Sequence, residues 1–259
     1  MPAAVITGAS SGIGLELARL FAADHHDLFL VARNEGALKN LAEDLRRKHG
    51  TRAFPVVADL SDAAGPATVA GAIEQAGVAV TALVNNAGFG LLGPFVETPL
   101  ERDREMIQVN VSALTDLTRR LLPGMVERRK GAVLNVASTA AFQPGPLMSV
   151  YYASKAYVLS FSLALSVELE GTGVTSTVLC PGPTRTAFQD VAGMKNVRMD
   201  RYAMDAATVA RAGYRAMRRG DPIVTPGLVN QLLALGTRMT PRIWTARIAK
   251  WLQEVRSKK

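Results

Sequence analysis

A tyrosine, a lysine and a serine in the middle of the chain have the residue types and the spacing that proton transfer requires. Tyr151 and Lys155 stand four residues apart, and Ser138 precedes Tyr151 by thirteen residues. If the segment is helical, the ammonium of Lys155 can sit beside the phenol on one face. A nearby cation favours phenolate and brings the tyrosine pKa, ordinarily near ~10, toward the working range of a general acid or base. Ser138 could hydrogen-bond the same oxygen. An exposed helix pair is the alternative for this pattern taken alone.

A glycine-rich stretch near the start of the chain is the second candidate site. The apolar residues 3–6 lead into a turn in which Gly8, Gly12 and Gly14 form the pattern Gly-x-x-x-Gly-x-Gly, and an amphipathic segment follows. A strand, a glycine turn and a helix start are the context of a dinucleotide site, because the backbone can approach the ligand and the helix amino terminus faces the pyrophosphate. The spacing differs from Gly-x-Gly-x-x-Gly, so the turn alone is a moderate signal.

Further motifs follow in an order that is typical of one family. They are Asn85-Asn86-Ala87-Gly88, Asn110, Ser138, Tyr151 with Lys155, and Pro181-Gly182. Together with the glycine turn they resemble the short-chain dehydrogenase/reductase superfamily over about residues 3–186. The resemblance implies a single domain over residues 1–259 with an α/β fold: a Rossmann-type, doubly wound parallel sheet of about seven strands flanked by helices on both faces.

The hydrophobic pattern predicts the same fold class. Short apolar segments alternate with segments of helical length, which is typical of a parallel sheet with helices on both faces. The predicted strands are residues 3–7, 28–32, 53–58, 82–85, 132–137, 174–180 and 222–225. No proline-rich or low-complexity linker divides the chain, so we expect one domain.

The resemblance assigns roles to individual residues. Tyr151 gives or takes the oxygen-bound proton, Ser138 positions and polarises the carbonyl, and Lys155 lowers the tyrosine pKa and holds the nicotinamide ribose. Asn110 falls inside a predicted helix, an unfavourable place for asparagine unless its side chain is needed. By resemblance it holds the backbone and a water that relays protons from the lysine, with a tolerated polar residue as the alternative.

The residue after the second predicted strand indicates which nicotinamide cofactor is bound. An acidic side chain there would repel a 2′-phosphate, whereas Arg33, followed by Asn34, can clamp it. We therefore expect NADP(H), with a plain surface arginine as the alternative. By resemblance, the cofactor-binding residues are Gly8, Ser10, Ser11, Gly12, Ile13, Gly14, Arg33, Asn34, Asp59, Leu60, Asn86, Ala87, Gly88, Tyr151, Lys155, Pro181, Gly182, Thr184 and Thr186.

Composition bears on compartment and chemistry. The single cysteine, Cys180, excludes an internal disulfide and suits a reducing compartment. The three histidines form no spaced cluster with cysteine or carboxylates, so no metal site is expected. Because a nucleotide-binding turn already begins at Thr7, we expect no signal peptide and a cytoplasmic protein.

Two stretches concern partners and substrate. The helix predicted over residues 151–170 is apolar or small on almost every side, so we expect a second subunit to cover it in a homodimer, as is common in the family, with a tetramer as the alternative. Residues 187–205 are expected to form a lid over the substrate.

Six apolar residues are expected to line the substrate pocket and favour an apolar ketone or acyl-type substrate: Phe89, Leu91, Leu92, Phe142, Leu147 and Met148.

The carboxy-terminal quarter carries all of the excess positive charge. Residues 1–194 contain 16 of the 30 basic and 18 of the 22 acidic residues, and residues 195–259 contain 14 and 4. Apolar and basic residues interleave over residues 228–259, and Pro241 is expected to start a second helix there. We expect this amphipathic extension to cover the substrate cleft with its apolar face and to turn its basic face outward. An interfacial helix in peripheral contact with anionic membrane is the alternative.

These observations predict an NADP(H)-dependent oxidoreductase that transfers a hydride between nicotinamide and a carbonyl or secondary alcohol. Its catalytic residues are Asn110, Ser138, Tyr151 and Lys155. Two alternatives remain: a non-catalytic dinucleotide sensor or scaffold, whose signature would be a broken catalytic set, and a binder of nucleic acid or membrane surfaces through the basic extension. The catalytic set is intact, and no nucleic-acid partner is expected.

Overall fold

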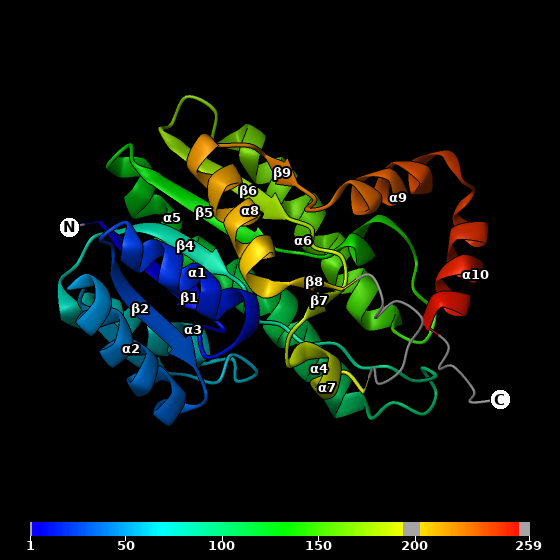
Figure 1. Ribbon diagram of the computed structural model, residues 1–259, viewed down its shortest axis with the longest axis horizontal. Coiled ribbons are helices and arrows are strands. Elements are labelled where there is room, and N and C mark those ends of the chain that lie inside the picture. The colour runs from blue at the N-terminus through cyan, green and yellow to red at the C-terminus, as the bar shows by residue number, and fades with distance from the viewer. Residues whose placement is uncertain (1, 194–202, 254–259) are drawn as a thin grey trace.

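The computed structural model describes residues 2–193 and 203–253 of the 259-residue chain. Its centre is a seven-stranded parallel sheet with the strand order β3-β2-β1-β4-β5-β6-β9 (Figure 1). The strands are β1 (Ala3–Thr7), β2 (Asp27–Ala32), β3 (Ala53–Val57), β4 (Val80–Asn85), β5 (Gly131–Val136), β6 (Val174–Leu179) and β9 (Ile223–Val224). The predicted α/β architecture and its seven parallel strands are therefore confirmed.

Helices cover both faces of the sheet because the strands are apolar on both faces. Successive side chains of a strand point to opposite faces, so Ala4 and Ile6 of β1 pack in one layer and Ala3 and Val5 in the other. The first layer contains α1 (Gly12–Ala23), α2 (Glu35–His49) and α8 (Ala206–Arg219). The second contains α3 (Gly65–Ala76), α5 (Leu114–Glu127) and α6 (Ser149–Glu168).

The strand order reverses at β1, which has β2 on one side and β4 on the other. The chain leaves the ends of β1 and β4 toward opposite helix layers, and a crevice opens between the two loops. Ligands of open α/β sheets bind at this place, outside the carboxyl ends of the strands.

Several short elements surround the crevice. They are α4 (Leu100–Ile107), the π-helix η1 (Gln108–Ala113), the 3-10 helix η2 (Thr139–Phe142), α7 (Phe188–Val191) and the parallel pair β7 (Thr184–Arg185) and β8 (Met204–Asp205). Of the lid expected over residues 187–205, residues 194–202 lie outside the described residues. The described parts of that segment include α7 and β8.

The described chain ends in two helices, α9 (Leu228–Met239) and α10 (Arg242–Gln253), which lie at one side of the domain (Figure 1). Their orientation is opposite to the expectation. Large apolar side chains such as Leu232 and Trp244 are more than half exposed, whereas Ala249 and Gln253 are buried. The apolar face does not cover the substrate cleft, because α10 packs on the domain through small and polar side chains. Among the described residues, no helix is both long and apolar enough to cross a membrane.

Gly14→Ala should destabilise the turn after β1, and Gly71→Ala in α3 is the matched control. A Cβ at position 14 would lie 2.3 Å from the carbonyl oxygen of Gly8, whereas a Cβ at position 71 meets nothing within 4 Å. We expect Gly14→Ala to lower the free energy of unfolding by about 1–3 kcal/mol. Gly71→Ala should leave it unchanged or raise it by up to about 1 kcal/mol, because alanine favours a helix. Equal stabilities of the two variants in chemical denaturation would contradict the tight turn.

Candidate active site

The glycine turn after β1 is bonded to the loop after β4. The side-chain nitrogen of Asn86 donates to the carbonyl oxygens of Thr7 at 2.9 Å and Gly8 at 3.3 Å. The Thr7 hydroxyl oxygen accepts from the backbone nitrogens of Asn86 at 3.0 Å and Ala87 at 2.9 Å. Gly8 has a φ of +66°, a conformation that glycine adopts without strain. These bonds fix the two loops between which a ligand would lie.

The same turn presents the amino terminus of α1 to the crevice. Ser11 occupies the N-cap position without a side-chain hydrogen bond to the helix. Such a helix end has unsatisfied N–H groups and a partial positive charge, which suit a phosphate. A Cβ on Gly12 would lie 3.0 Å from the Thr186 methyl, so the glycine keeps space open between the turn and the opposite wall. The residues present therefore fit the pyrophosphate of a dinucleotide.

A cleft of about 440 Å³ runs along the carboxyl edge of the sheet, from Arg33 after β2 to Tyr151 on α6. Its volume is in the usual range for cofactor sites. Every residue expected to bind the cofactor lines it except Gly14, which lies beneath the turn. Three of the four expected catalytic residues line it as well, and Asn110 lies behind them.

Arg33 lines one end of this cleft with an exposed guanidinium. Its Nη1 lies 3.9 Å from Asp59 Oδ2, and a long contact between exposed side chains contributes little. Asp59 instead accepts from the backbone nitrogen of Ser61 at 2.9 Å and from its hydroxyl at 2.7 Å. The arginine is thus available to an anion. Asn34 also lines the cleft, but its side chain caps α2 by accepting from the Ala37 nitrogen at 2.9 Å.

Asn110, in the π-helix η1, joins the loop after β4 to the helix α6. Its Oδ1 accepts from the backbone nitrogen of Phe89 at 3.1 Å, and its Nδ2 donates to the Phe89 carbonyl and to Ser154 Oγ, both at 3.0 Å. Ser154 in turn donates to the carbonyl oxygen of Tyr151 at 2.7 Å. π-Helical turns are frequent at functional sites, and this one turns the buried amide toward both partners. Asn110 therefore holds the backbone on two sides of the site.

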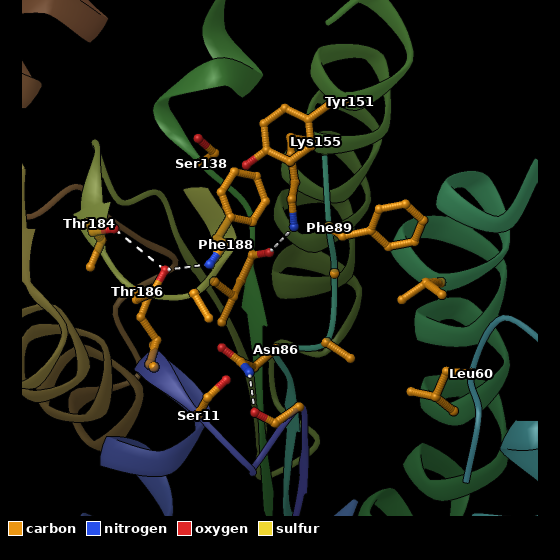
Figure 2. A pocket seen from close by; sticks show the side chains of 18 of the residues that line it. Ser11, Leu60, Asn86, Phe89, Ser138, Tyr151, Lys155, Thr184, Thr186 and Phe188 are labelled. Atoms are coloured by element: carbon orange, nitrogen blue, oxygen red, sulfur yellow. Dashed lines mark hydrogen bonds between the residues drawn. The ribbon is translucent and has the colours of Figure 1, made fainter. Parts of the chain in front are cut away.

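Lys155 is buried beneath Tyr151 (Figure 2). Its Nζ donates to the Val136 carbonyl oxygen at 2.8 Å and lies 5.9 Å from the centroid of the Tyr151 ring. A Cβ on Gly88 would lie 3.3 Å from Nζ, so glycine there leaves the ammonium its space. Burial disfavours the charged form and lowers the pKa of Lys155 to about 8.

Tyr151 and Ser138 lie together at one end of the cleft (Figure 2). Ser138 Oγ accepts from the backbone nitrogen of Ala140 at 3.1 Å, which holds the hydroxyl in place. Burial raises the pKa of Tyr151 above its ordinary value, and the hydrogen bond with Ser138 opposes the shift. The expected lowering by Lys155 is not seen, because the ammonium is directed to the Val136 carbonyl below the ring. Tyr151 is thereby held as a neutral phenol, the form of a proton donor.

The neighbouring Tyr152 has a different environment. Gln253 Nε2 donates to its phenolic oxygen at 2.5 Å, and its ring packs over Gly145, where a Cβ would come within 2.2 Å of the ring. Burial raises the pKa of Tyr152 to about 12, against the opposing effect of the Gln253 hydrogen bond. Tyr152 therefore links α6 to α10, and Tyr151 is the tyrosine that meets Ser138.

The loop after β6 forms the opposite wall. Thr184 Oγ1 donates to the Gly182 carbonyl oxygen at 2.9 Å. Thr186 Oγ1 accepts from the Phe188 nitrogen at 3.2 Å (Figure 2). These bonds direct Phe188 onto Tyr151, with ring centroids 5.3 Å apart. The loop thus closes the cleft over the phenol.

The structure corrects the expected substrate pocket. Of the six apolar residues, Phe89 and Met148 line the cleft. Four pack outside it, between neighbouring segments: Leu91, Leu92, Phe142 and Leu147. The reason is backbone pairing, since Gly93 donates to the Leu147 carbonyl at 2.8 Å and Leu92 to the Ala192 carbonyl at 2.9 Å. These bonds draw the loop after β4 onto its neighbours.

Sequence reasoning missed a chain of buried polar residues behind the site. Asn85 Nδ2 donates to Asn135 Oδ1 at 2.9 Å and to Thr118 Oγ1 at 3.0 Å, and Asn135 Nδ2 donates to Ser162 Oγ at 2.9 Å. These bonds connect β4, β5, α5 and α6, so they fix α6, which carries Tyr151 and Lys155, on the sheet. The available signal was the presence of Asn135 inside an otherwise apolar strand.

The chain matches the family described as short chain dehydrogenase over residues 2–196. With the fold and the site geometry above, this match shows that the protein belongs to the short-chain dehydrogenase/reductase superfamily, and the resemblance drawn from the sequence is confirmed. Members of this family are oxidoreductases that bind a nicotinamide dinucleotide.

Among curated relatives, a very-long-chain 3-oxoacyl-CoA reductase of Laccaria bicolor is 37% identical over 174 residues, which cover 66% of this chain and 52% of the relative. The chain spans about half the length of the first curated relatives that it matches.

Two solved structures show the same fold with different cofactors. A short-chain dehydrogenase from Sphingobium yanoikuyae in complex with NADPH has a TM-score of 0.81 and 35% identity, covering 92% of this chain and 94% of that one. An enzyme from Burkholderia phymatum in complex with NAD has a TM-score of 0.80 and 27% identity, covering 90% and 92%. The preference of this chain therefore depends on the residues of its own cleft.

The buried lysine predicts a pH-dependent stability of the protein without ligand. Because burial lowers the Lys155 pKa from 10.5 to about 8, the unfolded chain binds more protons than the folded one between these values. The free energy of unfolding should rise with pH from about 8 to about 10, by up to ~3 kcal/mol. Chemical denaturation should show this rise in the wild type and in Lys39→Met, which removes an exposed lysine, but not in Lys155→Met. Equal slopes in all three proteins would contradict the buried cation.

Proposed function

We propose that the protein is an NADP(H)-dependent oxidoreductase that transfers a hydride between nicotinamide and a carbonyl or secondary alcohol. The observation that carries the proposal is one continuous cleft with Arg33 at one end and Tyr151, Ser138 and Lys155 at the other. The first end offers an exposed cation for a 2′-phosphate. The second offers the groups for proton transfer. A dinucleotide of the family's type would join the two ends.

The bound cofactor supplies or accepts the hydride. In the reducing direction, Ser138, held by the Ala140 nitrogen, donates a hydrogen bond to the substrate carbonyl oxygen. Tyr151 gives that oxygen its phenolic proton. Lys155, whose Nζ donates to the Val136 carbonyl oxygen at 2.8 Å, would hold the nicotinamide ribose of the bound cofactor beside Tyr151. Asn110 holds the loop after β4 and the helix of Tyr151 in fixed positions relative to one another during these steps.

An apolar ketone or acyl-type compound is the substrate class that we propose. Apolar side chains border the cleft around Tyr151, including Ala140, Met148 and Phe188. The similarity to a very-long-chain 3-oxoacyl-CoA reductase supports an acyl chain in that region. A long apolar substrate gains binding free energy with each methylene that it buries.

We also propose a homodimer through α6. Val167 is 65% exposed on this helix, and the exposed ring of Tyr157 stacks on Phe161 with centroids 5.8 Å apart. Burying these side chains against a second copy would cover the outer face of α6.

The first prediction from this proposal concerns cofactor choice. Arg33→Asp places a carboxylate where a 2′-phosphate would bind, so affinity for NADPH should fall by about a hundredfold or more while affinity for NADH is kept or gained. Arg46→Asp makes the same charge change on the exposed face of α2 and should leave both affinities within about twofold. Isothermal titration calorimetry measures them. Equal binding of NADPH and NADH by the wild type would contradict the proposal.

The second prediction separates the adjacent tyrosines. Tyr151→Phe should lower kcat for NADPH-dependent ketone reduction by about a hundredfold or more, with NADPH affinity nearly unchanged. Tyr152→Phe should keep activity and instead lose about 1–3 kcal/mol of stability, because Gln253 Nε2 is left buried without its partner. Steady-state kinetics and thermal unfolding report these outcomes. An inactive Tyr152→Phe beside an active Tyr151→Phe would reverse the assignment.

A further inference from the structure

The helix α10 exposes its large apolar side chains and buries its small and polar ones. Thr245, Ala249 and Gln253, spaced four residues apart, are no more than 5% exposed. Four large apolar side chains on the other faces are 54–62% exposed: Ile243, Trp244, Ile248 and Trp251. A helix that packs only against its own domain normally turns its apolar face toward that domain and its polar face toward solvent. The exposed apolar face of α10 therefore indicates a binding surface for another molecule.

The helix α9 repeats the pattern. Asn230 is 8% exposed and donates to the Pro226 carbonyl oxygen at 2.7 Å, so a polar side chain again faces the domain. The apolar side chains on the outer face are 57–84% exposed: Leu228, Val229, Leu232, Leu233, Leu235 and Met239. Together the two helices present ten exposed large apolar residues, more than a solvent-facing surface normally carries. We refer to the outer faces of α9 and α10 as the outer apolar surface.

Both helices are fixed to elements of the active site. The Asn230 side chain lies against Gly182, where a Cβ would come within 2.4 Å of it. Gln253 donates to the phenolic oxygen of Tyr152 at 2.5 Å. The pair therefore holds the outer apolar surface in a set orientation at one side of the domain (Figure 1).

The charge of this surface identifies its partner. No aspartate or glutamate occurs from residue 222 to residue 253. Arg242, Arg247 and Lys250 are exposed on α10, among its apolar side chains, and the Arg247 guanidinium lies 5.2 Å from the centroid of the Trp244 ring. Exposed tryptophan with interleaved arginine and lysine is typical of helices that lie in the interface of a bilayer, where the rings enter the headgroup region and the cations meet anionic lipid.

We propose that the outer apolar surface docks the protein onto the surface of an anionic lipid bilayer, with α9 and α10 lying in the interface. An isologous contact with a second copy is less favourable, because it would bring the cations of two α10 helices together with no carboxylate of either helix pair between them. The docking is independent of the proposed reaction, since its observable is lipid binding and not turnover.

The test uses the full chain and vesicles of phosphatidylcholine alone or of an equimolar mixture with phosphatidylglycerol. The protein should sediment with the mixed vesicles, less so as salt is added, and weakly with phosphatidylcholine. The two tryptophans of the chain, Trp244 and Trp251, both lie in α10. Their fluorescence should therefore shift to the blue with mixed vesicles and be quenched by brominated lipid.

Two double variants and a control separate the apolar and electrostatic contributions. Ile243→Ser with Ile248→Ser removes exposed apolar side chains, and Arg242→Gln with Lys250→Gln removes two charges; each should weaken binding to mixed vesicles about tenfold. Arg46→Gln with Arg47→Gln removes two exposed cations from α2 and should keep binding within about twofold. Thermal unfolding of all variants confirms that they are folded.

Three results would overturn the proposal. One is absence of sedimentation with mixed vesicles. Another is an equal loss in the α2 control and the α10 charge variant, which would mean that net charge alone acts. The third is a dimer in sedimentation velocity that Ile243→Ser with Ile248→Ser dissociates while the tryptophan spectrum stays unchanged by lipid, which would assign the surface to a second copy.

Discussion

The backbone of the turn after β1 lies so close to Asn86 that one added carbon at Gly8 or Gly14 would overlap the Asn86 side chain. This close approach joins the loops after β1 and β4 where the strand order reverses, and the amino terminus of α1 and the run from Asn86 to Gly88 take their positions from it. Gly88 in turn leaves space for Lys155. The close approach of these two loops thus places the two walls of the cleft relative to one another.

Burial then sets the chemistry at the catalytic end. The same exclusion of water that lowers the Lys155 pKa to about 8 raises that of Tyr151, so a cation and a neutral phenol stand together near neutral pH. Such groups keep their positions only if the surrounding polar atoms are paired. Asn110 with Ser154, and Asn135 with Ser162, supply that pairing at two positions along the buried side of α6.

The parallel sheet and the residues around the cleft could be predicted because they depend on local pattern: apolar runs of strand length, glycines in a turn, and a tyrosine and lysine one helical turn apart. The direction of the Lys155 ammonium could not be predicted, because this group donates to the Val136 carbonyl oxygen of β5, an element distant from α6 in the sequence. Leu91 and Leu147 were misplaced for the same reason, because pairing between loops distant in sequence decides where they pack. The outward face of α10 depends on Gln253 and Tyr152, which are separated by 101 residues.

We propose that the cleft passes a hydride from NADPH to a carbonyl carbon. The most direct measurement supplies NADPH deuterated on both hydrogens of the nicotinamide C4, together with a long-chain ketone, and locates the label by mass spectrometry. If this proposal is correct, the wild type places one deuterium on the carbinol carbon of the product, and Tyr151→Phe forms at least about a hundredfold less labelled product per unit time. Product that carries no deuterium at that carbon, or equal labelling rates for the two proteins, would contradict it.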